Sequence, residues 1–157
     1  MIDLEKTKPG HVKYIWKHLR EMDRKELALF NMYDHNYMTR IMRDATLAAT
    51  VRIDGKPAGI VGYTEKGGTL QVFFFGTPAI SKHFREVYRL ALLSLRRLQH
   101  SYPQKRISVR VWETYRSSVR WLTNMGFVDK NLTIGRPGER LRYMEWDNGI
   151  RIKACAE

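Results

Sequence analysis

The sequence predicts an α+β fold: one central, mostly antiparallel mixed sheet that is flanked by helices. One observation behind this prediction is a change of hydrophobic period, from helical spacing over residues 9–30 to alternation over residues 47–75. Another is a pair of hairpin signals, Asp-Gly at 54–55 and Gly-Gly at 67–68, which divide the alternating stretch into three strands. The full expected order is β-α-α-β-β-β-α-β-α-β-β.

The N-terminal third is expected to form a first strand and two short helices. Pro9 follows Thr7 and suits the first turn of a helix. A second helix is expected over residues 22–30, and residues 31–43 are either loop or irregular helix. The first helix carries apolar residues at helical spacing, namely Val12, Ile15, Trp16 and Leu19.

Three strands are expected next, over residues 47–53, 58–63 and 69–75. The Gly-Thr-Pro segment at 76–78 ends the third strand, and a long basic helix follows over residues 81–99. The apolar face of this helix is expected to point inward and consists of Phe84, Val87, Tyr88, Ala91, Leu95 and Leu98.

The C-terminal third is expected to hold a strand at residues 107–112, a helix at 117–124 and two last strands. Gly126 is well placed to cap the helix, because glycine readily adopts the left-handed conformation that ends many helices. Phe127 then begins a strand, and the final strand covers residues 141–146.

The composition is that of a folded domain. The chain has 157 residues, of which 43% are hydrophobic and 28% charged, so we expect a single domain over residues 1–147 and a tail at 148–157. No apolar run reaches the roughly 18 residues that cross a bilayer, and the charged N-terminus is unlike a signal peptide, so no membrane partner is expected. The single cysteine, Cys155, cannot form an internal disulfide, which fits a reducing compartment.

The charge balance is strongly basic, with 28 Lys and Arg against 16 Asp and Glu and a net charge of +12. Such a field favours anionic partners, whether a nucleotide, a nucleic acid or an acidic protein surface. The bias is sharpest over residues 80–120, which hold ten cationic side chains and two carboxylates. The alternative is a solvated face that keeps the protein soluble.

The order of elements and the segment VRWLTNMGF at residues 119–127 resemble the GNAT superfamily of acyl-CoA-dependent N-acyltransferases. Within it, residues 75–81, 98–103 and 116–127 are more similar to GNAT-like proteins of tailed bacteriophages, of the internal-virion or assembly type. The resemblance covers roughly residues 44–146. It implies a GNAT-like fold, acetyl-CoA as the acyl donor, an unidentified amine or protein acceptor, and a place in the host cytoplasm or the virion among virion or host proteins.

The resemblance places the cofactor pyrophosphate at the start of the long helix, usually against a glycine-rich turn. Free amides and the positive end of a helix attract phosphate, and glycine lets the backbone come close. The turn at residues 76–83 has a single glycine, and Pro78 supplies no N–H. The alternative is an ordinary capped helix that covers the sheet. The candidate cofactor-binding residues are Phe75, Gly76, Thr77, Ser81, Lys82, His83 and Arg85.

The resemblance also implies a tyrosine one turn before the Gly-Phe pair, acting as the acid towards the leaving thiolate. That position is Leu122, which cannot donate a proton, so Tyr115 is the candidate substitute; an interfacial aromatic role is its alternative. Transfer to an amine needs a base within hydrogen-bond reach, and Glu113 at the end of a strand is the candidate. Its alternative is pairing with Arg110 or Arg116. Weaker candidates for the base are Glu65, Asp34, His35 and His83.

Three functions remain open from the sequence. The first is an acyl-CoA-dependent N-acyltransferase, and the second a non-catalytic GNAT-like phage protein that serves in assembly or interaction. The third is a basic adaptor for host nucleic acid or an anti-host defence protein; for nucleic acid, Trp112 and Trp121 among the arginines could supply stacking surfaces. The five histidines show no metal-ligand spacing, so no metal site is predicted.

Overall fold

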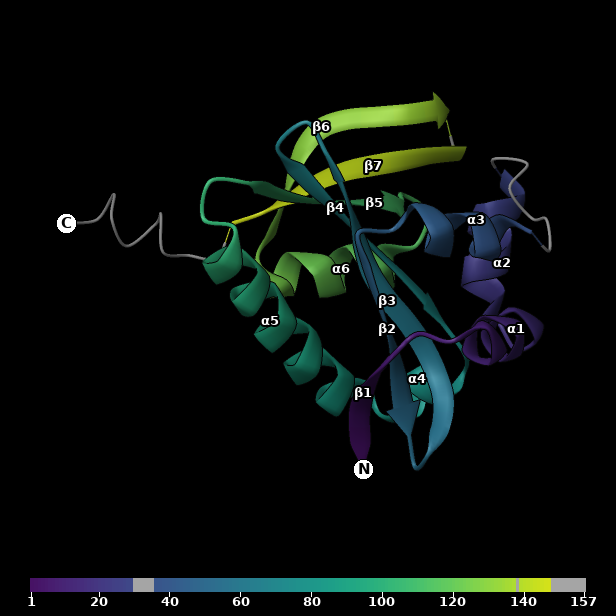
Figure 1. Cartoon of the computed structure of the whole chain (residues 1–157). Helices are drawn as coiled ribbons and strands as arrows, with labels where there is room; N and C mark the ends of the chain where they lie inside the picture. The colour runs from purple at the N-terminus through teal and green to yellow at the C-terminus, as the bar shows by residue number, and fades with distance from the viewer. Residues whose placement is uncertain (30–35, 138, 148–157) are drawn as a thin grey trace. The chain divides into compact units, whose positions relative to one another are not determined.

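The computed structural model describes residues 1–29, 36–137 and 139–147 (Figure 1). One seven-stranded sheet has the order β1-β2-β3-β4-β5-β7-β6 and is flanked by helices, which confirms the predicted α+β fold. No helix in these ranges is long and apolar enough to span a membrane. The elements are β1 (Ile2–Lys6), α1 (Pro9–Lys17), α2 (Glu21–Leu29), α3 (Tyr37–Asp44), β2 (Leu47–Ile53), β3 (Lys56–Lys66), β4 (Thr69–Gly76), α4 (Ala79–Lys82), α5 (Phe84–Ser101), β5 (Arg106–Trp112), α6 (Arg116–Met125), β6 (Phe127–Arg136) and β7 (Glu139–Trp146).

The chain divides into two compact units. The first unit comprises Met1–Glu65 with Val72–Ala91, and the second unit comprises Lys66–Gln71 with Leu92–Glu157. The boundary therefore passes through β4 and through α5. The prediction of a single domain over residues 1–147 stays a prediction, and the predicted tail, with Cys155, lies outside the described residues.

In the first unit, β1 pairs with β2 and β2 pairs with β3, both antiparallel. The predicted turn between β2 and β3 is made by Asp54 and Gly55, whose φ angles are 50° and 80°. Positive φ at two successive residues gives the tight turn whose twist matches that of the strands it joins. This explains why β2 has the predicted bounds.

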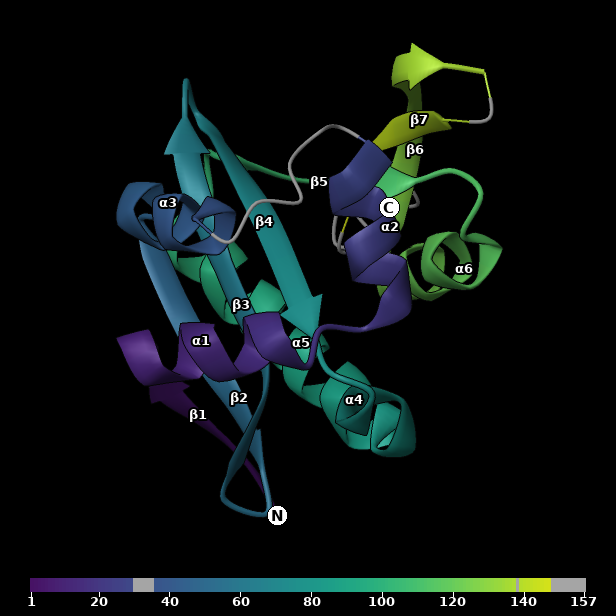
Figure 2. The ribbon, with the colours of Figure 1, turned by 90° about the vertical axis from the view of Figure 1, so that its right-hand side faces the viewer.

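Two hydrophobic clusters pack on opposite faces of the strands of the first unit. Ile15 and Met38 are fully buried against Ile60, so α1, α2 and α3 cover one face (Figure 2). The cluster on the other face contains Ile80 of α4 and Val87 of α5. The ambiguous segment after residue 30 thus becomes the helix α3 from Tyr37 onward, while residues 30–35 lie outside the described residues.

The single basic helix predicted over residues 81–99 is wrong in one respect, because the structure has two helices here, α4 and α5. His83 separates them with φ −121° and ψ 35°, outside the helical region. Phe84 then becomes the first residue of α5 and is 50% exposed, although the sequence predicts it to point inward. Val87 and Leu95 are buried as predicted.

In the second unit, β7 pairs antiparallel with both β5 and β6. The first three residues of β4 pair with the first three of β5, and this ladder is parallel. Leu70, Ile107 and Met144 are almost completely buried. Gly126 ends α6 with φ 110°, which confirms the predicted left-handed C-cap.

Candidate functional site

The end of β4 is held in the first unit by an ion pair that joins the start of α2 to the strand. Arg20 donates to Asp23 through Nε at 2.9 Å and through Nη2 at 3.0 Å. The Gly76 amide donates to Asp23 Oδ2 at 2.9 Å, and the Arg20 amide donates to the Gly76 carbonyl at 2.8 Å. Both backbone polar groups of Gly76 are therefore bonded within the protein. We call Arg20, Asp23 and Gly76 the β4 clasp.

Close packing explains why the last residue of β4 is glycine. A Cβ atom at Gly76 would lie 3.0 Å from Phe74 Cε1, 3.1 Å from Arg20 Nε and 3.2 Å from Ile80 Cγ1. The Arg20 guanidinium carbon also lies 5.2 Å from the centroid of the Phe74 ring, so a cation–π contact fixes the same side chains. The single glycine of the turn thus serves the β4 clasp.

The next residue, Thr77, is bonded to β3. Its amide donates to the Ala58 carbonyl at 2.8 Å, its hydroxyl donates to the same carbonyl at 3.0 Å, and its side chain is buried. Pro78 has no N–H to offer. The amides of Gly76 and Thr77, which the sequence analysis assigned to the cofactor, are therefore already used by the protein.

The other predicted cofactor residues lie where α4 meets α5. Ser81, Lys82 and Arg85 are exposed and His83 is half-buried, whereas Phe75 is buried under the helices of the first unit. The first amides of a helix have no partner within it, and the start of α5 adds the positive end of the helix dipole. Exposed cations beside this helix start suit an anionic group such as a phosphate.

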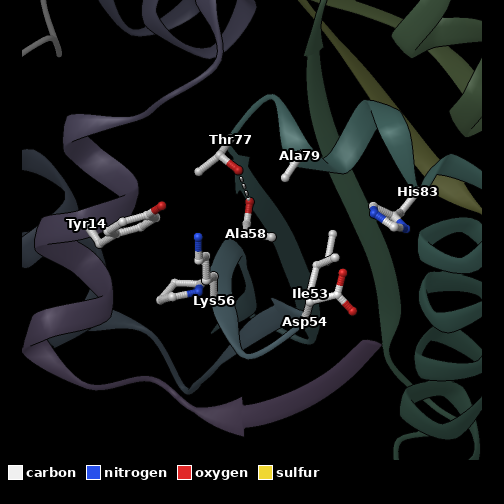
Figure 3. A pocket seen from close by; sticks show the side chains of 9 residues that line it. Tyr14, Ile53, Asp54, Lys56, Ala58, Thr77, Ala79 and His83 are labelled. Carbon is white, nitrogen blue, oxygen red and sulfur yellow. Dashed lines mark hydrogen bonds between the residues drawn. The ribbon is translucent and has the colours of Figure 1, made fainter. Parts of the chain in front are cut away.

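A pocket of about 270 Å³ lies beside the same turn (Figure 3). Tyr14 and His83 line it from opposite sides, and Lys56 comes from β3. The hydrogen bond from Thr77 to Ala58 runs along its wall. Its lining is mixed in charge, because the Asp54 carboxylate lies there with the Lys56 ammonium and the His83 imidazole.

The candidate base lies in the second unit, after the end of β5. Glu113 Oε2 is 3.7 Å from Arg142 Nη2, and Arg142 also pairs with Asp129. The expected alternative for this carboxylate was pairing with Arg110 or Arg116, but its partner is on β7. The strand register explains this, because Val111 lies opposite Arg142. Glu113 is thus part of an ion-pair network, and its catalytic role stays a prediction.

Tyr115, the candidate acid, lies at the start of α6 and packs on the last residue of β5. Its ring centroid is 4.5 Å from that of Trp112, with the planes at 78°, an edge-to-face contact. The structure therefore brings Glu113 and Tyr115 to the same corner of the second unit. All seven predicted cofactor residues belong to the first unit. The catalytic assignment of Tyr115 stays a prediction.

A further carboxylate, Glu26, is not among the residues that the sequence patterns predicted for the site. It follows Arg20 and Asp23 at intervals of three residues, a spacing that places side chains on one side of a helix and was the available signal. Burial raises the pKa of Glu26 from 4.5 to about 7, the charge of Asp23 adds to the rise, and Arg20 opposes it. Of the weaker candidate bases, Glu65 is exposed, and Asp34 and His35 lie outside the described residues.

Metal chemistry finds no support in the described ranges. No group of three His, Cys, Asp or Glu side chains there could hold a metal ion.

No family model matches the chain, and no curated protein matches its sequence. Solved structures do match it. The PaiA N-acetyltransferase of Thermoplasma acidophilum, in complex with coenzyme A, has a TM-score of 0.70 at 12% identity and covers 94% of this chain and 99% of its own. A chimera of the spermidine N-acetyltransferase SpeG from Vibrio cholerae and hSSAT has a TM-score of 0.67 at 17% identity, covering 97% and 98%. The ribosomal-protein-S18-alanine N-acetyltransferase of Escherichia coli has a TM-score of 0.65 at 11% identity, covering 93% of each chain. This chain therefore has the GNAT N-acetyltransferase fold.

Proposed function

We propose that this protein is an acyl-CoA-dependent N-acyltransferase of phage origin that acts in the host cytoplasm or the virion, with acetyl-CoA as the acyl donor. Acetyl-CoA would supply the acyl group in activated form, as a thioester. The fold supports the proposal, since similar structures include N-acetyltransferases and one of them is a complex with coenzyme A. The observation that carries it is the pair of exposed cations Lys82 and Arg85 at the junction of α4 and α5, a few residues after the hydrogen-bonded end of β4.

Different residues would make different contacts with the phosphates of the cofactor. Lys82 and Arg85, both exposed, would neutralise the phosphates, and Ser81 and His83 would add hydrogen bonds. The β4 clasp would keep this turn in place, because Gly76 is bonded on both sides. With the amides of Gly76 and Thr77 already used, charged side chains would contribute more of the affinity than backbone groups.

Titration calorimetry with coenzyme A and acetyl-CoA tests the proposal. We expect binding by the natural chain, weakened at least about 10-fold by K82A/R85A, because two charge-assisted contacts are lost. The matched control is R96A/R97A, which removes the same charge from exposed positions further along α5 and should bind normally. An absence of binding at millimolar ligand would refute the proposal.

A second candidate is a non-catalytic GNAT-like protein that serves in virion assembly or binds a host protein. The observation that favours it is the use of the Gly76 and Thr77 amides by Asp23 and Ala58, which leaves the turn without two expected phosphate ligands. Co-purification with virion proteins, together with no binding of coenzyme A, would establish this function instead.

A further inference from the structure

The strands β5, β7 and β6 lie side by side in the second unit and bury only one of their two faces well (Figure 1). Ile107 on β5, Met144 on β7 and Phe127 on β6 belong to the buried face and are no more than 2% exposed. α6 packs on this face, since the Trp146 indole donates to the Met125 carbonyl at 2.8 Å. Side chains alternate along a strand, so the residues next to these point to the other face.

The strand register arranges the other face in three rows. In each row a residue of β6 lies opposite one of β7, and that one lies opposite one of β5. The rows are Val128 with Glu145 and Ser108, Leu132 with Tyr143 and Arg110, and Ile134 with Leu141 and Trp112. The three members from β6 are all apolar and are 45%, 60% and 48% exposed. We call Val128, Leu132 and Ile134 the β6 ridge; a line of exposed apolar side chains is typical of an interaction surface.

A hollow of about 420 Å³ lies beside the β6 ridge. Leu132 and Tyr143 line it together with the charged groups of Arg106, Lys130 and Glu145. The Tyr143 hydroxyl donates to Glu145 Oε1 at 3.1 Å. The nitrogens of Arg106 and Lys130 come only within 3.9 Å of this carboxylate, and both side chains are exposed, so they can still donate to another anion. The hollow thus has an apolar wall and a cationic rim.

The charges of this face indicate the chemistry of its partner. Arg106, Arg110 and Lys130 are exposed here, and Glu145 is the only carboxylate in the three rows. Cations beside an apolar line suit a partner that carries carboxylates and apolar side chains together. A second copy would bring like charges together, because the chain has a net charge of +12. The tail at 148–157 has two cations and one carboxylate, so it also lacks the complementary charge.

The edge of β6 is less suited to binding than its side chains. β6 is the last strand of the sheet in the described ranges and pairs with β7 alone, and extended peptides can add to such edges. Its register shifts between Asp129 and Leu132, where Asn131 has φ 56° and its amide donates to Asp129 Oδ1 at 2.8 Å. A bulge of this kind interrupts the edge and hinders strand addition. The contact surface is therefore the side-chain face.

We infer that the β6 ridge and the hollow beside it bind an acidic amphipathic segment of another protein. An apolar side chain of the segment enters the hollow against Leu132 and Tyr143. Carboxylates on either side of it pair with Arg106 and Lys130, and its other apolar side chains cover the rest of the β6 ridge. The inference does not depend on the proposed function, whose cofactor residues belong to the first unit.

The apolar contact is tested with a labelled peptide of about 16 residues that carries leucines at helical spacing and glutamates between them. Fluorescence anisotropy measures its affinity for the full chain. L132S/I134S should weaken binding at least about 10-fold. The matched control L47S/L93S replaces two leucines that are 52% and 45% exposed on other elements, and it should bind within about 2-fold of the natural chain. Thermal unfolding checks that both variants fold.

The charge contact is tested in the same assay with R106A/K130A, which should also weaken binding at least about 10-fold. R96A/R97A removes the same charge from exposed positions on α5 and should change the affinity by no more than about 2-fold. A peptide with lysine in place of glutamate should not bind the natural chain. Equal losses in R96A/R97A and R106A/K130A would show that net charge alone attracts the peptide and would overturn the site.

Other occupants of this face would give different results. Single-stranded oligothymidylate that binds more tightly than the peptide, and is weakened by R106A/K130A but not by L132S/I134S, would assign the face to nucleic acid. A dimer of the natural chain in sedimentation, dissociated by L132S/I134S, would assign it to a second copy. Either result, no peptide binding at millimolar concentration, or an affinity unchanged in L132S/I134S would overturn the inference.

Discussion

Glu26 on α2, in the first unit, and Glu113 after the end of β5, in the second unit, differ in their partners. Glu113, beyond β5, pairs with Arg142 within a network that includes Asp129. Glu26, one helical turn after Asp23 on α2, has no such partner among the described residues and has a raised pKa. Burial without a cationic partner disfavours the ionised form of a carboxylate, as at Glu26. Position along a sequence thus identifies a charged residue, and the fold decides its partners and its burial.

The largest expected effect comes from removing the group that holds the end of β4. D23A leaves the guanidinium of Arg20 and the amide of Gly76 without their partner in a largely buried place. We expect the free energy of unfolding to fall by about 3 kcal/mol, because breaking a buried pair strands the remaining charge. Urea unfolding measures this, and E21A is the control, since the exposed pair of Glu21 with Lys25 should matter little.

A D23A protein as stable as the natural chain would show that the β4 clasp does not hold the strand end. The first unit would then have no stabilising carboxylate at the end of β4 to compare with the ion-pair network after β5. The same variant should also lower the pKa of Glu26, because Asp23 is one cause of its rise.

Filling the space at the strand end should have the next largest effect. In G76A the new methyl group would meet Phe74, Arg20 and Ile80 at 3.0 to 3.2 Å, and Arg20 cannot move freely while it is bonded to Asp23. We expect a loss of about 2 kcal/mol in the free energy of unfolding, typical of overpacking.

G10A is the matched control for G76A. Gly10 lies in the first turn of α1, and nothing comes within 4 Å of an added Cβ. This variant should gain about 0.5 kcal/mol, because alanine lowers the entropy of the unfolded chain and favours helix. Equal effects of the two substitutions would contradict the close packing at Gly76.

The raised pKa of Glu26 makes stability depend on pH in a direction that can be derived. The folded protein holds the proton up to about pH 7 and the unfolded chain releases it near 4.5, so stability falls as the pH rises between these values. E26Q cannot ionise at this position, so it does not lose stability for this reason as the pH rises. We expect E26Q to be more stable than the natural chain at pH 9 by about 1 to 2 kcal/mol, allowing for its partial exposure, and no more stable at pH 4.

Urea unfolding at both pH values provides the measurement, with E21Q as control. A constant difference between E26Q and the natural chain across this range would mean that Glu26 titrates normally. The contrast between the two glutamates would then disappear.

Much of the fold could be predicted because its signals are local. The bounds of β2 follow from the Asp-Gly turn with positive φ at both residues, and the end of α6 follows from Gly126. The break at His83 could not be predicted, because neither glycine nor proline marks it and the apolar spacing continues across it. Turn and cap residues therefore predicted the ends of elements reliably, whereas the lack of such a residue did not exclude a break in a helix.

The site was less predictable because its contacts are long-range. Asp23 and Gly76 are 53 residues apart, and nothing in the turn at 76–83 shows that its first two amides are bonded elsewhere. The partner of Glu113 depends on the register of β5 and β7, which brings in Arg142 rather than the neighbouring arginines. Charged residues can be found in a sequence, but their pairing depends on the fold.

The smallest expected effect on stability comes from Glu113 in the second unit. E113Q weakens one contact of Arg142, which keeps its pairing with Asp129, so the free energy of unfolding should fall by only about 0.5 kcal/mol. Urea unfolding of E113Q and D23A under the same conditions checks this order. A loss for E113Q as large as that for D23A would show that Arg142 depends on Glu113 as strongly as Arg20 depends on Asp23. The expected difference is large because Asp23 is the only carboxylate that pairs with Arg20 among the described residues, whereas Arg142 pairs with two.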